Sequence, residues 1–69
     1  MNTGTLIAWV EGRGFGFIRP DTGGEDIFVH ISAFEAVGLG VPSKGERYAF
    51  DTEVDTRNDK PRAVNPRVV

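Results

Sequence analysis

The feature that most restricts the fold of this chain is that its apolar residues occur in short segments ended by glycine, proline or acidic turns. A chain of 69 residues without cysteine has neither a disulfide framework nor a thiolate metal site to support a small core. A closed sheet protects backbone groups without a large core, so we expect a single domain over residues 1–69 built as a five-stranded barrel. The expected strands are residues 5–10, 15–19, 26–30, 47–54 and 62–69.

The segments between these strands have the composition of turns. Residues 21–24 read Asp-Thr-Gly-Gly and predict a hairpin turn, because glycine accepts positive φ at little cost. Residues 31–37 have room for one or two helical turns before Gly38, and no more. Pro66 interrupts the last strand and lacks a backbone donor, so it should lie at a sheet edge or at a bulge.

The strongest local signal is the run Arg13-Gly14-Phe15-Gly16-Phe17-Ile18. Strand side chains alternate between faces, so Phe15 and Phe17 project from the same side. Such a pair either fills a core or forms a flat platform. Ile7 and Ile18 can fill the inward face, and Arg13 stands beside the rings. This pattern favours a platform on which bases stack while a basic residue contacts phosphate.

A second run, Asp26-Ile27-Phe28-Val29-His30-Ile31-Ser32, supplies further rings. Phe28 and His30 share one face of a strand that should pair with the first run across the glycine turn. Trp9 on the first strand would be a fourth aromatic ring. His30 is the only histidine and there is no cysteine, so we expect no metal site.

Together these runs resemble a cold-shock domain, from about Leu6 to Asn65. The resemblance implies an all-β fold: a five-stranded antiparallel Greek-key barrel (OB-fold), with at most a short 3-10 turn after the third strand. It also implies binding of single-stranded RNA or DNA with low sequence specificity. An RNA-chaperone, transcription-antitermination or translation-regulatory role would follow.

The resemblance places stacking residues at Trp9, Phe15, Phe17, Phe28 and His30, with Arg13 where the family usually has lysine. From the basic C-terminal segment we add Lys60 and Arg62 as candidate nucleic-acid-binding residues. The sequence departs from the family at Ala8, Val10 and Ile31, where other members commonly carry a lysine or further rings. The expected platform is therefore narrower than is usual in the family.

The net charge of −2 argues against a binder dominated by phosphate contacts, although basic residues collect after position 56. No apolar run approaches the roughly 20 residues of a membrane span. We expect a cytoplasmic monomer without cofactor, catalytic residue, membrane contact or small-molecule substrate. Two alternatives remain open: a barrel whose rings bind a protein or saccharide, and a weak module of a longer protein. No spacing of residues suggests an enzyme.

Overall fold

The computed structural model describes residues 2–69 and contains five strands and one short helix. The elements are β1 (Asn2–Val10), β2 (Phe15–Pro20), β3 (Ile27–His30), α1 (Ile31–Ala36), β4 (Arg47–Asp55) and β5 (Lys60–Val68). All five strands expected from the sequence are present, with ends that differ by up to three residues. Among residues 2–69, no helix has the length and apolar character that a membrane crossing requires.

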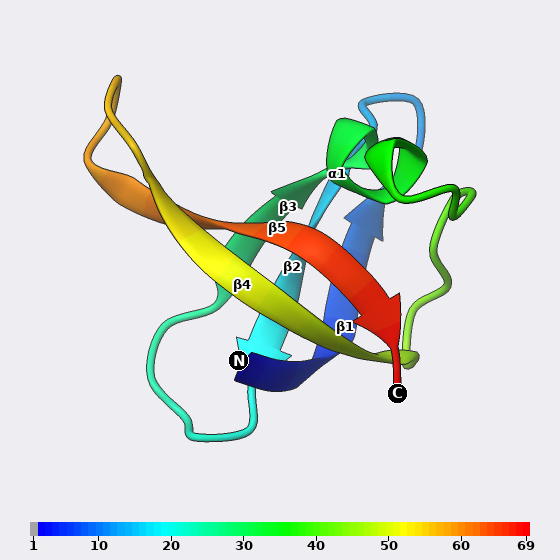
Figure 1. Ribbon diagram of the computed structural model, residues 1–69, viewed down its shortest axis with the longest axis horizontal. Coiled ribbons are helices and arrows are strands. Elements are labelled where there is room, and N and C mark those ends of the chain that lie inside the picture. The colour runs from blue at the N-terminus through cyan, green and yellow to red at the C-terminus, as the bar shows by residue number, and fades with distance from the viewer. Residues whose placement is uncertain (1) are drawn as a thin grey trace.

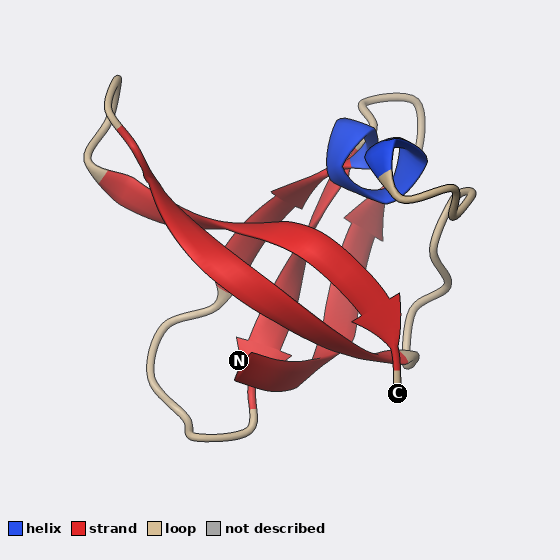
Figure 2. Ribbon diagram, in the orientation of Figure 1, coloured by secondary structure: helices blue, strands red, loops and turns tan. Residues whose placement is uncertain are grey.

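The strands close into a barrel in the order β1-β2-β3-β5-β4, which confirms the expected all-β, five-stranded closed fold. In Figures 1 and 2, β4 and β5 form a long twisted hairpin that crosses in front of β1, β2 and β3. One detail differs from the expected antiparallel pattern: β3 and β5 run parallel, and the single ladder pair between them is Phe28 with Arg62. A parallel pair needs a long connection, and here α1, the segment after it and β4 lie between the two strands in the sequence.

The short element after β3 is α-helical, and not the 3-10 turn that was expected. His30 caps its N-terminus: the Ser32 backbone N–H donates to Nδ1 of the imidazole at 3.1 Å. The helix carries Phe34 into the core, where that ring meets Tyr48 edge-on at 5.2 Å between centroids. Burial of Phe34 stabilises a helix that would be too short to form alone.

The core consists of the buried residues Leu6, Ile18, Val29, Phe34, Tyr48, Phe50 and Ala63. Leu6 stands directly opposite Ile18 in the β1–β2 ladder, and both side chains are fully buried. Ile7, which the sequence placed on the inward face, is only half-buried. The β1–β2 register shifts between Leu6 and Ala8, and this irregularity changes the alternation along β1.

Pro66 lies at a bulge, as expected from its missing donor. The β4–β5 register shifts after the Ala49–Arg67 pair, so Asn65 and Pro66 together stand opposite a single residue, Phe50. Asn65 has a φ of 53°, in the left-handed region that asparagine tolerates better than most residues. The bulge buries the proline ring in the barrel wall.

A cluster of polar side chains joins β1 and the β2–β3 loop to β4. Arg47 donates from Nη1 to Asp21 at 3.0 Å and to Thr5 at 3.2 Å. The Thr3 hydroxyl donates to the same carboxylate at 2.7 Å. The Arg47 hydrogen bonds, followed by the one from Thr3, lower the pKa of Asp21 from 3.8 to about 2.

This cluster predicts an acid-sensitive contribution to folding. The folded pKa of Asp21 is below its unfolded value, so the contribution is complete above about pH 4 and is lost as the pH falls through about 2. We expect a carbon-13 NMR titration of the Asp21 carboxylate to show a midpoint near 2. In an Arg47→Gln variant the midpoint should rise towards 3.8, and a wild-type midpoint already near 4 would contradict the prediction.

Candidate nucleic-acid interface

Three phenylalanine rings meet on the outer face of β2 and β3. Phe17 stands opposite Phe28 in the ladder, with ring centroids 6.1 Å apart and an interplanar angle of 74°. Phe15 lies 5.5 Å from Phe28 at a tilt of 31°, and 6.2 Å from Phe17. All three side chains are half-buried, whereas Ile18 and Val29, the residues that follow Phe17 and Phe28, are in the core. We call Phe15, Phe17 and Phe28 the ring cluster.

Gly16 separates two of these rings for a packing reason. Its position faces the barrel interior, where a Cβ atom would overlap the carbonyl oxygen of Ala8 and approach the Trp9 ring to 2.7 Å. Only glycine lets β1 and the Trp9 ring come this close. The close packing of β2 against β1 therefore requires glycine between the two phenylalanines.

Trp9 lies apart from the ring cluster, in contrast to its expected place as a fourth ring of the platform. It pairs with Gly16 in the β1–β2 ladder, and its ring packs edge-on against Phe34 at 6.1 Å between centroids. The β1 residues that stand opposite Phe17 and Phe15 are Ala8 and Val10. On its β1 side the ring cluster thus ends at small aliphatic side chains.

His30 extends the outer face at the end of β3, where it stands opposite Phe15 and is exposed. Its Nδ1 atom accepts the Ser32 N–H and lies 3.0 Å from the Ser32 hydroxyl. A ring nitrogen that accepts a backbone N–H carries no proton, so in the neutral ring the proton is on Nε2. His30 therefore combines a ring face with a donor at its outer edge.

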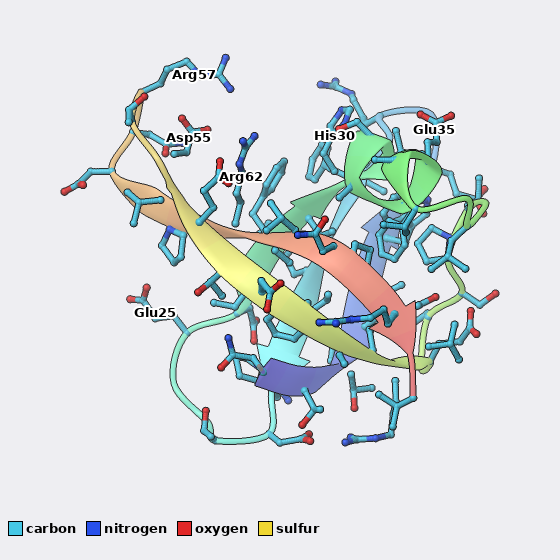
Figure 3. The ribbon with its side chains drawn as sticks, viewed as in Figure 1. Glu25, His30, Glu35, Asp55, Arg57 and Arg62 are labelled. Carbon is cyan, nitrogen blue, oxygen red and sulfur yellow. The ribbon has the colours of Figure 1, made fainter. Side chains whose placement is uncertain are left out.

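A hollow of about 430 Å³ opens beside the ring cluster, between the β2–β3 loop and the tip of the β4–β5 hairpin. It is lined by Phe17, Glu25, Asp26, Phe28, Asp55, Arg57, Asn58, Lys60, Pro61 and Arg62. Figure 3 shows Asp55 and Arg57 at the hairpin tip, with Glu25 on the loop across from it. Two ring faces, three carboxylates and three basic side chains thus share one concave surface.

Most of the basic side chains near this hollow are already paired with carboxylates. Arg62 donates from Nη2 to Glu53 at 2.9 Å, and this bond raises the pKa of Arg62 above its ordinary value. Arg57 donates to Asp55 at 3.3 Å and, mainly through this bond, lowers the pKa of that carboxylate. Exposed pairs of this kind add little to the stability of a fold. Their main consequence is for binding, since a paired cation has less charge to offer a phosphate.

Two of the predicted basic residues are not paired in this way. Within the part of the chain that the structure describes, neither Arg13 nor Lys60 makes an ion pair. Arg13 is exposed in the turn that leads into β2, and Lys60 lines the hollow at the start of β5. Among the described residues, neither therefore has a carboxylate partner that would compete with a phosphate.

A second, smaller hollow of about 150 Å³ lies further along β5 and is lined by His30, Ser32, Ala33, Arg62, Ala63, Val64 and Asn65. Arg62 lines both hollows. In Figure 3 its side chain lies between Arg57 at the hairpin tip and His30 at the start of α1. The two hollows therefore share Arg62 as a lining residue.

The structure brings six of the eight predicted residues to the ring cluster and the two hollows beside it. Arg13 lies in the exposed turn before β2, and Trp9 packs against the core. Sequence reasoning missed the acidic lining and Arg57, which come from the two loops at one end of the barrel. Residues 55–60 lie between two of the expected strands, and their density of charged residues beside a basic strand is the signal that could have indicated this surface.

A closed five-stranded barrel with open aromatic rings on β2 and β3, beside a charged hollow, is the architecture of an oligonucleotide-binding barrel. Residues 2–68 match the family model described as the 'Cold-shock' DNA-binding domain. The chain therefore belongs to the cold-shock domain family, whose members bind nucleic acids and are not enzymes.

Individual relatives agree with this assignment. The chain is 42% identical over 67 residues to cold shock protein CspA of Rhizobium meliloti, and the match covers 97% of each chain. It is 42% identical over 65 residues to the probable cold shock protein y4cH of Sinorhizobium fredii, covering 94% of each. It is also 42% identical over 60 residues to the cold shock-like protein CspC of Shigella flexneri, covering 86% of this chain and 84% of that one.

Proposed function

We propose that this protein binds single-stranded RNA or DNA with low sequence specificity, by stacking bases on Phe15, Phe17, Phe28 and His30. The observation that carries the proposal is the ring cluster: three half-buried rings with centroids 5.5–6.2 Å apart on an outer strand face. Every base has a π-face, so such a surface accepts many sequences. Arg13, Lys60 and Arg62 contact the phosphates.

The geometry supports modest affinity. Each base stacked on an aromatic ring contributes about 1–3 kcal/mol. Three or four stacked bases, less the cost of ordering a flexible strand, place the dissociation constant in the micromolar range, which corresponds to about 8 kcal/mol. Trp9 lies against the core and adds little to this free energy of binding.

The protein acts as a monomer, because closure of the barrel pairs each strand on both sides and leaves no strand edge for a second copy.

Weak, base-tolerant binding suits a protein that keeps RNA single-stranded and releases it readily. We therefore propose an RNA-chaperone role, expressed as transcription antitermination or translational regulation. The binding surface has no feature that selects one base sequence, since its rings lie on strand faces and its cations contact phosphate. A protein or saccharide ligand remains the competing function, and no specific observation favours it.

The salt dependence of binding tests how much of the binding free energy comes from base stacking on the rings and how much from phosphate contacts. With Arg13 and Lys60 unpaired and Arg62 shared with Glu53, two or three phosphates are neutralised. At −0.7 per phosphate for a single strand, the logarithm of the binding constant should fall against the logarithm of salt concentration with a slope of about −1.4 to −2.1. The measurement is fluorescence anisotropy of labelled oligouridine and oligothymidine between 50 and 300 mM salt, roughly the range over which such slopes are resolved.

The same titration with duplex RNA and duplex DNA is the control, because paired bases cannot stack on protein rings. We expect binding to both duplexes to be at least about tenfold weaker than to the single strands. Equal affinity for duplex and single strand, or a slope much steeper than predicted, would contradict stacking and point to phosphate contacts. No binding to any oligonucleotide would favour the protein or saccharide ligand.

A further inference from the structure

Arg62 is the basic residue best placed to contact a phosphate of a bound strand, and it forms an ion pair with an acidic neighbour. It stands opposite Phe28 in the barrel's parallel pair and lines both hollows of the interface. A strand that runs from Phe28 towards His30 on the β5 side of the ring cluster brings a phosphate close to this guanidinium. Figure 3 shows the Arg62 side chain between Arg57 at the hairpin tip and His30 at the start of α1.

The acidic neighbour is Glu53, directly opposite Arg62 in the antiparallel β4–β5 ladder. Its Oε1 accepts from Nη2 of Arg62 at 2.9 Å, with the two side chains 57% and 43% exposed. The Nε atom of Arg62 is buried and has no hydrogen-bond partner within residues 2–69. One edge of the guanidinium is thus occupied by a carboxylate, while another donor remains unused.

A phosphate and a carboxylate compete for the same donors. Both present paired oxygens that match the planar fork of arginine. While Arg62 is bonded to Glu53, the pair has no net charge, and a strand gains little from approaching it. To contact Arg62 fully, a phosphate must displace the Glu53 carboxylate and also tolerate its negative charge.

We propose that Glu53 is an internal competitor for Arg62 that limits the affinity of the interface for single-stranded nucleic acid. This inference rests on the proposed function and assigns a role to a residue that does not itself line either hollow. The consequence is binding that is weaker and less salt-dependent than the number of basic residues implies. Removing the Glu53 charge should release Arg62 to the phosphate.

The other pair at the interface has a different role. Asp55 accepts the backbone N–H of Arg57 at 2.9 Å as well as its side chain, and its own carbonyl accepts the N–H of Asp59 at 2.8 Å. Its carboxylate is 19% exposed, against 57% for Glu53. Asp55 therefore builds the hairpin turn, whereas the exposed Glu53 serves no turn and can be changed without disturbing the tip.

The experiment compares Glu53→Gln with Asp51→Asn. Asp51 is two residues away on the same strand, pairs with Arg67 at 3.8 Å and lines neither hollow, so its variant makes an equal charge change away from the interface. Binding of labelled oligothymidine is measured by anisotropy over a range of salt concentrations. We expect Glu53→Gln to bind about three- to tenfold more tightly at low salt, with a slope steeper by about 0.7, corresponding to one further phosphate. Asp51→Asn should gain less than about twofold, with no change in slope.

An Arg62→Gln background separates direct competition from a general effect of charge. In that background Glu53→Gln should give no gain beyond that of Asp51→Asn, since there is no guanidinium to release. Equal gains from the two single variants, or a gain from Glu53→Gln that persists without Arg62, would overturn the inference while leaving wild-type binding intact. If wild type and both single variants all fail to bind, the proposed function itself is wrong. Thermal unfolding of each variant verifies that the binding measurements compare folded proteins.

Discussion

Replacing Phe28 with alanine should weaken binding of single-stranded oligonucleotides by about tenfold or more. Phe28 lies within 6.1 Å of both other rings of the cluster and also lines the larger hollow, so its loss removes the centre of the stacking surface. The side chain projects outward and is only half-buried. The fold should therefore persist, because the inward residues of β3 are untouched.

The matched control is Val68→Ala. Val68 is an apolar residue of β5, is 61% exposed and lines neither hollow. It should leave affinity unchanged. Binding of the same labelled oligothymidine by wild type and the two variants is measured by anisotropy, with circular dichroism to verify folding. Unchanged affinity in both Phe28→Ala and Phe15→Ala would show that the rings are not the binding surface.

The second large effect is on folding. Gly16→Ala adds one methyl group, yet its Cβ would overlap the Ala8 carbonyl oxygen and lie 2.7 Å from the Trp9 ring. Backbone of the neighbouring strand cannot move away without breaking the β1–β2 ladder. Overpacking of this kind costs about 1–3 kcal/mol or more. A domain stabilised by about 0.05–0.15 kcal/mol per residue has little to spare, so we expect most of its stability to be lost.

Gly40→Ala makes the same chemical change where nothing lies within 4 Å of the added Cβ and φ is not positive. It should be neutral or slightly stabilising, because alanine restricts the unfolded chain more than glycine does. Urea unfolding followed by circular dichroism gives the two free energies of unfolding. Similar stability of Gly16→Ala and Gly40→Ala would contradict the close packing of β1 on β2.

Much of the fold was predictable because its strands carry local signals. Alternation within residues 15–19 and 26–30 correctly separated the outward rings from the inward Ile18 and Val29. The glycine turn correctly joined these strands into a hairpin. Pro66 could be placed at an edge or a bulge from its missing N–H alone. In each case the controlling physics, side-chain alternation or a backbone donor, operates within a few residues.

The positions of Trp9 and Ile7 were not predictable in this way. Alternation along β1 is interrupted by a register shift between Leu6 and Ala8, and the sequence has no mark for it. That shift accompanies burial of Leu6, and Trp9 lies over Gly16 and against Phe34. The position of Trp9 thus depends on contacts with β2 and α1, which are elements outside β1.

The sequence by itself determined the five-stranded all-β barrel, its aromatic strand face, and membership of a nucleic-acid-binding family. These depend on residue type and short spacing, which a single chain displays directly. Only the tertiary structure decided that Trp9 packs against the core and that Arg62 faces both Phe28 and Glu53. Those relations arise when strands distant in sequence are brought together, because barrel closure sets register, and register sets which charges and rings meet.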